Sequence, residues 1–269
     1  MNYENEILKI KKKRSRVMGL LIAIEILILI FTSPVHIVIA DNVIVDYQGM
    51  PFIVTLILMF ICFVVGAFAY TAVSMPVYYA MDREADPEKQ LVMNMQLNKN
   101  AKRTEDILYA SDYLYLGIYP KAIEYSEMMI ANKNVRVHLS GIFNKARSQF
   151  FMENYEGFFE SVAAYKESLA NANKMNEKHK DAYLKIDAVL DFMCAIANND
   201  AEKMTSMKDN VSVWSASKPA EGFVNYIKGL AANKLGDREE AIYRFKLVKE
   251  SCPKIVFAKY ATEQLLDMD

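Results

Sequence analysis

Two long runs of apolar residues occupy most of the first 80 positions of the chain. The first covers residues 17–40 and the second covers residues 51–80. A helix that crosses a membrane needs about 20 apolar residues at a rise of about 1.5 Å each. Both runs are long enough, so they predict a hairpin of two transmembrane helices. Proline is expected to end or kink each helix, at Pro34 in the first and at Pro76 in the second.

Two other interpretations of the first run remain open. Such a run can also be a buried helix of a soluble protein. It can be a signal peptide that is cleaved after Val38, Ile39 and Ala40, where small residues follow an apolar stretch. The length of the run and the acidic Glu25 within it argue against cleavage. If the first run were cleaved, the second run would still anchor the chain.

The pattern changes after the second run. Residues 81–104 are polar and charged and predict a linker. From Glu105 onward, apolar positions recur with the period of a helix and short turns interrupt them. The sequence predicts helices at 105–116, 119–131, 134–152, 155–173, 178–198, 200–209, 218–235, 238–251 and 254–267.

A regular spacing of small, aromatic and turn-forming residues marks the end of the chain. Gly229 and Ala241 are small, so two antiparallel helices can approach closely there. Phe245 is placed to fill the space between neighbouring helix pairs. Gly236 lies where the turn between the helices needs a left-handed residue, and Pro253 is expected to start the next helix. The five residues together predict a helical hairpin.

The spacing recurs upstream, which indicates a repeat. Three further pairs combine a turn-forming Gly or Asn with an apolar residue five positions later: Gly117 with Ala122, Asn154 with Phe159, and Asn199 with Met204. The last unit resembles the tetratricopeptide repeat (TPR). It departs from that motif at Asn225, Lys228 and Ala232, where the family usually has Trp, Leu and Tyr. The resemblance implies an all-α fold, a TPR-like α-solenoid, with a peptide-binding inner groove; an irregular helical bundle is the alternative.

Charge is distributed unevenly along the chain although the net charge is only -1. Residues 1–17 carry a net charge of +4, residues 18–81 carry -3, and residues 82–269 carry -2. Basic residues stay on the cytoplasmic side of a membrane. We therefore expect a cell-membrane protein with two spans, with both termini in the cytoplasm. The last segment has no basic field that would attract nucleic acid.

Glu25 is the acidic residue deepest in the first span. An ionised side chain at that depth costs about 2.5–3.5 kcal/mol, so Glu25 should be protonated or have a partner. Tyr70, Thr71 and Ser74 of the second span are the expected intramembrane polar partners. The cluster is either a proton or ion site or a hydrogen bond that holds the hairpin or a dimer together.

The rest of the sequence contains no recognised catalytic or metal-binding motif. The cysteines are Cys62, Cys194 and Cys252, and neither they nor the three histidines have metal-ligand spacing. Phosphate-loop, dinucleotide-binding and hydrolase motifs are also missing from the sequence. We therefore predict no enzymatic activity, no catalytic residue, no cofactor and no metal.

These observations predict four segments: a basic cytoplasmic N-terminus (1–16), a transmembrane hairpin (17–80), a linker (81–104) and a TPR-like domain (105–269). The predicted function is that of a membrane-anchored adaptor or scaffold. Its expected partners are the lipid bilayer and an unidentified protein or peptide, and a second copy of the chain is a further candidate. The alternative is a membrane sensor or transport accessory protein that uses the hairpin around Glu25.

Overall fold

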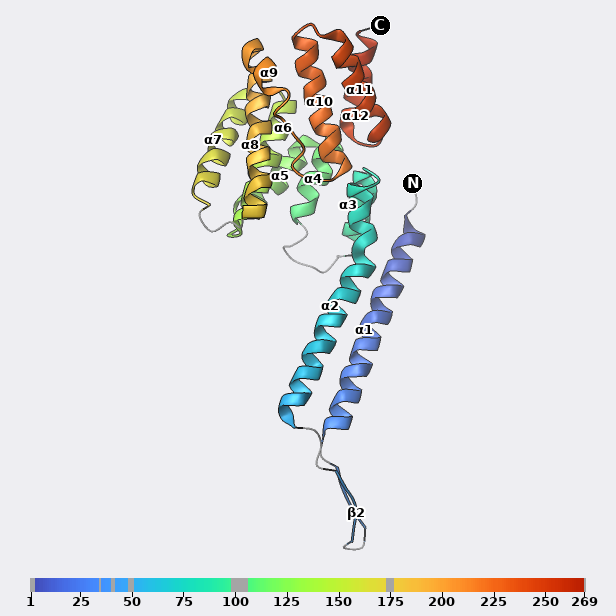
Figure 1. Ribbon diagram of the computed structural model, residues 1–269. Helices are drawn as coiled ribbons and strands as arrows, with labels where there is room; N and C mark the ends of the chain where they lie inside the picture. The colour runs from blue at the N-terminus through green and yellow to red at the C-terminus, as the bar shows by residue number, and fades with distance from the viewer. Residues whose placement is uncertain are drawn as a thin grey trace. The chain divides into compact units, whose positions relative to one another are not determined.

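Both apolar runs form long helices in the computed structural model of the chain (Figure 1). Helix α1 spans Glu4–Thr32 and helix α2 spans Phe52–Asp82. The short strands β1 (Val35–Ile39) and β2 (Asn42–Tyr47) pair antiparallel between them. The structure describes residues 3–33, 35–39, 42–47, 51–97, 106–172 and 177–268.

Local sequence explains where α1 ends. Ser33 adopts an extended conformation (φ -76°, ψ 139°), as expected for a residue that precedes proline. The apolar run predicted up to residue 40 is therefore helical only as far as Thr32, and residues 35–39, four of which are β-branched, form strand β1. Helix α2 continues through Pro76, so this proline does not end the helix.

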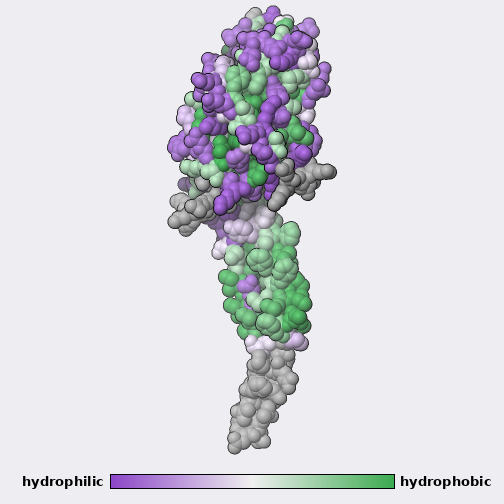
Figure 2. Space-filling model, turned by 90° about the vertical axis from the view of Figure 1, so that its left-hand side faces the viewer, coloured by the Kyte–Doolittle hydropathy of each residue, from purple (hydrophilic) through white to green (hydrophobic). Residues whose placement is uncertain are grey.

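The chain divides into two compact units, residues 1–76 and residues 77–269. In the first unit the large apolar side chains of α1 and α2 point outward, and Figure 2 shows the resulting hydrophobic surface. Only 6% and 11% of the most apolar windows of α1 and α2 are buried. Both helices are long and apolar enough to cross a membrane, and their exposure excludes the interpretation as buried core helices.

The second unit is built from antiparallel helices. Four helical hairpins follow one another, α4–α5, α6–α7, α8–α9 and α10–α11, and α12 packs against α11. Every helix predicted beyond residue 105 has a counterpart. The bounds are α3 (Pro87–Leu97), α4 (Asp106–Tyr115), α5 (Tyr119–Ile130), α6 (Val135–Phe151), α7 (Tyr155–Ala170), α8 (Glu177–Ala197), α9 (Ala201–Met207), α10 (Lys218–Lys234), α11 (Arg238–Ser251) and α12 (Val256–Leu266).

The predicted linker contains a helix that the sequence analysis did not assign. Asp86 caps α3, because its carboxylate accepts a hydrogen bond from the backbone N–H of Lys89 at 2.9 Å. The same buried carboxylate forms an ion pair with Lys254, at the turn before α12. Residues 87–97 therefore fold as part of the second unit.

One turn geometry joins the helices of each hairpin. The residue at its centre has a positive φ: 76° at Gly117, 58° at Glu153, 52° at Asn199 and 78° at Gly236. In each case its N–H bonds to the carbonyl three residues back and the next N–H bonds to the carbonyl five back, as at Gly236 and Asp237. Three of the four predicted turn residues are confirmed. At the second turn Glu153 takes the left-handed conformation and Asn154 instead caps α7.

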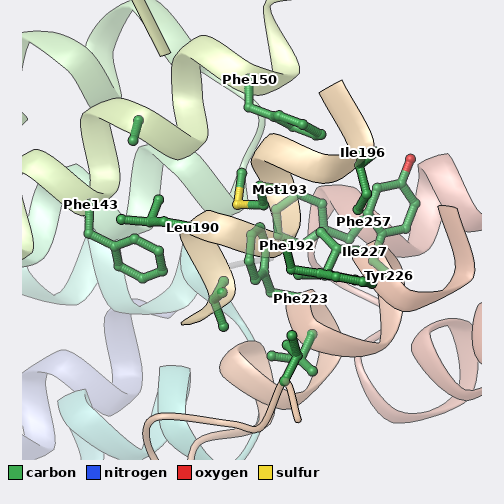
Figure 3. Close-up of a cluster of buried hydrophobic side chains, with 14 of the residues drawn as sticks. Phe143, Phe150, Leu190, Phe192, Met193, Ile196, Phe223, Tyr226, Ile227 and Phe257 are labelled. Carbon is green, nitrogen blue, oxygen red and sulfur yellow. The ribbon is translucent and has the colours of Figure 1, made fainter. Parts of the chain in front are cut away.

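This shift corrects the predicted register by one residue. The position five residues after each left-handed residue is buried: Ala122, Phe158, Met204 and Ala241 are at most 1% exposed. The predicted Phe159 is only partly buried beside Phe158. Figure 3 shows the core that these hairpins enclose, with side chains converging from α6, α8, α10 and α12.

Candidate functional site

The predicted repeat residues meet where α10 crosses α11. A Cβ added to Gly229 would lie 2.6 Å from the Phe245 ring, so glycine is needed for this close contact. Ala241 and Phe245 are both fully buried. Gly236 supplies the left-handed turn (φ 78°). Pro253 lies in the turn before α12 and not at its first residue, because the helix begins at Val256.

A second close helix crossing was missed in the sequence. A Cβ added to Gly141 of α6 would lie 2.7 Å from Met129 Cβ and 2.8 Å from the carbonyl oxygen of Ser126, both on α5. Backbone atoms cannot move aside as a side chain can, so this position tolerates no larger residue without separation of the helices. The glycine falls in the middle of a helix, where only tertiary packing explains it.

Two of the predicted polar residues of α2, Tyr70 and Ser74, contact an arginine and not Glu25. Arg14 of α1 donates hydrogen bonds to Ser74 Oγ from Nε (3.1 Å) and Nη2 (2.8 Å), and its guanidinium lies 5.0 Å from the centre of the Tyr70 ring. Thr71 donates its hydroxyl proton to the carbonyl of Ala67. The expected cluster of Glu25 with Tyr70, Thr71 and Ser74 is therefore wrong.

The antiparallel register of α1 and α2 explains this error. Arg14 lies opposite Ser74, and Leu21 contacts Gly66, so Glu25 lies near the level of Cys62. At about 1.5 Å per residue, that is roughly 13 Å along the helix from Thr71. Glu25 is half-buried and makes no side-chain hydrogen bond or ion pair with the part of the chain that the structure describes.

The second unit contains a cavity of about 460 Å³. The first helix of each hairpin contributes to its wall, together with the ends of α2 and α3 and the loop before α10. The volume lies within the usual range of small-molecule sites. Its lining residues are Tyr78, Met81, Asp82, Gln90, Ser111, Tyr115, Met129, Ser140, Phe143, Asn144, Arg147, His179, Ala182, Tyr183, Ile186, Trp214, Ser215, Ser217 and Pro219.

Arg147 is a buried cation at the wall of this cavity. Arg147 is 2% exposed, and its guanidinium carbon lies 4.2 Å from the centre of the Phe143 ring and 5.5 Å from that of Trp214. Each such cation–π contact contributes about 0.5–2 kcal/mol. Arg147 donates from Nη1 to Tyr115 Oη at 3.0 Å and from Nη2 to Asn144 Oδ1.

The hydrogen bonds of Arg147 are incomplete. Its Nε atom is buried and has no acceptor among the described residues, and no acidic side chain within them pairs with the guanidinium. Burial of a charge without an opposite charge is unfavourable by several kcal/mol. The site therefore has the electrostatic character of an anion receptor.

Asp112 is a second buried ionisable group of this unit. It is fully buried, and neither carboxylate oxygen has a hydrogen-bond partner within the described residues. Burial raises the pKa of the Asp112 carboxyl well above its ordinary value of 3.8. Neither Asp112 nor Arg147 stands out in the sequence, because helical periodicity alone does not reveal which charged positions are buried.

The remaining candidates have structural roles. Trp214 packs edge-on against Phe143 and Phe223, with ring centres 4.9 Å and 5.8 Å apart. His138 bonds to the carbonyl of Ile130 and to Ser168. His179 contacts Arg136 Nη1 at 3.0 Å. Within the ranges that the structure describes, no group of His, Cys, Asp and Glu has metal-binding geometry.

No protein-family model matches this chain, and neither the curated proteins nor the solved structures contain a significant match.

Proposed function

We propose that this protein is a membrane-anchored adaptor whose TPR-like helical hairpins bind a protein or peptide at the cytoplasmic face of the membrane. The observation that carries the proposal is the cavity, because the first helices of all four hairpins, α4, α6, α8 and α10, contribute to its wall. A stack of repeated hairpins brings corresponding helices together on one inner face, where such proteins bind extended partners.

The anchor follows from the first unit. Helices α1 and α2 expose large apolar side chains along their length, and lipid is the solvent in which this arrangement is stable. The basic residues before the first span and the acidic loop after it favour cytoplasmic termini. A cysteine placed at Gln48 should therefore react with an impermeant maleimide in intact cells, whereas one placed at Lys180 should not.

Site-specific crosslinking tests the recruitment itself. A photoreactive benzoylphenylalanine at Ser215, an exposed residue of the cavity wall, should crosslink to a partner in native membranes. The same group at Ala164, an exposed residue of α7 outside the cavity, is the matched control. Adding Ser140→Phe, which fills the cavity, should abolish the crosslink at Ser215. Equal crosslinking from both positions, or an adduct that survives Ser140→Phe, would contradict the proposal.

A sensor or transport accessory role is the second candidate. It rests on Glu25, a half-buried acid of α1 without a described partner. Glu25→Gln keeps the shape of the side chain and removes its charge. An adaptor should keep its abundance and its crosslink at Ser215 in this variant. Loss of the crosslink at unchanged abundance would favour the sensor.

A further inference from the structure

We infer that the cavity of the second unit binds a small monocarboxylic acid with an apolar body, and that Arg147 holds its carboxylate. This inference goes beyond the recruitment of a protein partner and can fail independently of it. Three observations lead to it: an incompletely paired buried cation, an aromatic wall, and a balance of charges that suits one negative charge.

The cation is positioned by the fold. Tyr115 of α4 and Asn144 of α6 each accept one hydrogen bond from the guanidinium, and Asn144 Nδ2 donates in turn to Ser111 Oγ at 3.3 Å. These residues all line the cavity. The guanidinium has five N–H donors in total, and the Nε donor has no described acceptor. A carboxylate is the anion whose planar oxygens match this geometry.

Aromatic rings form part of the wall around Arg147. Phe143, Trp214 and Tyr183 line the same cavity, and the first two contact the guanidinium through their ring faces. Such surfaces bind the hydrocarbon part of a ligand, while one polar group fixes its orientation. The rings and the cation together favour a ligand that has both parts.

The charges at the cavity favour one negative charge over two. Apart from Arg147, its ionisable lining residues are the exposed Asp82, His179 and the tyrosines. His179 is already engaged by Arg136. A phosphate monoester carries a charge of about -1.5 to -2 near neutral pH, so one guanidinium does not balance it and Asp82 repels it more strongly than it repels a carboxylate. A carboxylate carries one charge, which the guanidinium balances.

Trp214 provides a direct assay, because it is the only tryptophan of the chain and lies in the cavity wall. The full chain in detergent is titrated with 3-phenylpropionate, 3-phenylpropan-1-ol, 3-phenylpropylamine and phenyl phosphate, and tryptophan fluorescence and calorimetry are followed. We expect saturable binding of the acid, about tenfold tighter than that of the alcohol, since the charged hydrogen bond is lost with the alcohol. The amine and the phosphate should bind more weakly than the acid.

Two variants test the site. Arg147→Gln should weaken binding of the acid by about tenfold or more and change binding of the alcohol by less than about threefold. Its control is Arg244→Gln, which also removes an arginine that bonds to an asparagine but lies outside this cavity. Ala182→Phe fills the cavity, keeps Arg147 and should abolish binding of both compounds, whereas Ala164→Phe should not. Circular dichroism checks that each variant is folded.

Several results would overturn the inference. They are the absence of saturable binding of the acid by both methods, equal affinities for acid and alcohol, and tighter binding of phenyl phosphate. An unchanged affinity in folded Ala182→Phe would place the acid elsewhere. A peptide with a free C-terminal carboxylate that binds more than about tenfold tighter than the acid, and tighter than its amide, would assign the site to a protein partner. The crosslink at Ser215 is measured separately, so failure here leaves the recruitment proposal standing.

Discussion

Phe60 and Phe68 of α2 are 68% and 74% exposed, whereas Phe245 and Phe257 of the second unit are fully buried. Phenylalanine thus lies on the exposed surface of α2 in the first unit and in the buried core of the second unit. In water, exposure of so much apolar surface is unfavourable by about 25 cal/mol per Å². In lipid it is not, and close packing between the helices comes from small or polar residues such as Gly66 and Ser74. The exposed apolar surface of α1 and α2 thus suits lipid, whereas the second unit has the buried apolar core of a water-exposed domain.

The largest expected effect comes from charged residues on the exposed face of α2, which should prevent its insertion into lipid. Ile57 and Ile61 are 54% and 52% exposed. Changing both to Lys should cost about 5–7 kcal/mol of insertion free energy, taking about 2.5–3.5 kcal/mol for each charge at the centre of a span. The span should then fail to insert.

Labelling of Cys62 measures whether α2 has inserted. In a chain that carries Cys194→Ser and Cys252→Ala, an impermeant maleimide should label Cys62 in the Ile57→Lys/Ile61→Lys variant and not in the parent. Met128→Lys and Tyr243→Lys, at exposed apolar positions of the second unit, form the matched control and should change stability by less than about 0.5 kcal/mol each. Protection of Cys62 in the double lysine variant would contradict the expected failure of α2 to insert.

Sequence predicted the helices well because their signal is local. Apolar runs, helical periodicity and turn residues are all read within a few positions, and Gly117, Asn199 and Gly236 adopt the left-handed turns expected of Gly and Asn. Glu153 was missed because its neighbour Asn154 is the better local candidate, and Asn154 serves as the helix cap instead.

The contacts between distant segments were not predictable in the same way. The pairing of Arg14 with Ser74 depends on the register of two spans that carry no marked register signal. Helix α3 is polar in composition, and it joins the second unit through the burial of Leu91 and Met93 and through the ion pair of Asp86 with Lys254, far away in sequence. Aromatic rings from α4, α6, α10 and the loop before α10 likewise surround the guanidinium of the buried Arg147. The candidate site therefore emerged only from the structure.

A close helix crossing tests the packing of the second unit. Gly141→Ala forces a Cβ against backbone atoms of α5, so we expect a loss of stability of about 3 kcal/mol, at the upper end for overpacking. The control is Gly19→Ala, because a Cβ at Gly19 of α1 meets no atom within 4 Å. Thermal unfolding of the full chain in detergent should show a lower midpoint only for Gly141→Ala. Equal midpoints would mean that α5 and α6 separate easily.

The crossing of α10 and α11 should respond more locally. Ala241→Leu overpacks a fully buried position and should cost about 2 kcal/mol. In a stack, each hairpin mainly stabilises its neighbours, so hydrogen exchange should accelerate in α10, α11 and α12 and remain unchanged in α4 and α5. Leu at the exposed Ala164 is the control. Uniform acceleration across the unit would indicate one cooperative bundle and not a stack.

Asp112 links stability to pH. Burial raises the pKa of the Asp112 carboxyl in the folded protein. The carboxyl therefore contributes its full stabilisation below pH 3.8, its ordinary pKa in the unfolded chain, and this stabilisation is lost as the pH rises through the higher folded pKa. Asp112→Asn cannot ionise. Relative to the parent, this variant should gain stability with rising pH by up to about 1.4 kcal/mol per pH unit within that window. Urea unfolding at pH 4, 6 and 8 measures the gain.

The control for this prediction has the opposite sign. The pKa of the partly exposed Asp200 is lowered, first by the backbone N–H of Lys203 and then by its ammonium group. Its contribution is therefore present above pH 3.8 and lost as pH falls, so Asp200→Asn should be relatively destabilising at high pH. A gain for Asp112→Asn that is independent of pH would show that its carboxyl has an ordinary pKa in the folded protein.

The smallest expected effect concerns the four turns, where one conformation is built from different residues. Gly236 adopts φ 78° without steric cost, whereas Glu153 at φ 58° carries a side chain in the left-handed region. Gly236→Ala should therefore destabilise the unit by about 1 kcal/mol, and Glu153→Gly should stabilise it by up to about 1 kcal/mol. Thermal unfolding of both variants, with Glu153→Ala as the control for loss of the carboxylate, gives the comparison.

If Glu153→Gly leaves the midpoint unchanged while Gly236→Ala lowers it, the left-handed Glu153 is stabilised by contacts of its own side chain. If Glu153→Gly raises the midpoint and Glu153→Ala does not, the left-handed backbone is the repeated feature of the hairpins, and the residue that occupies it is secondary.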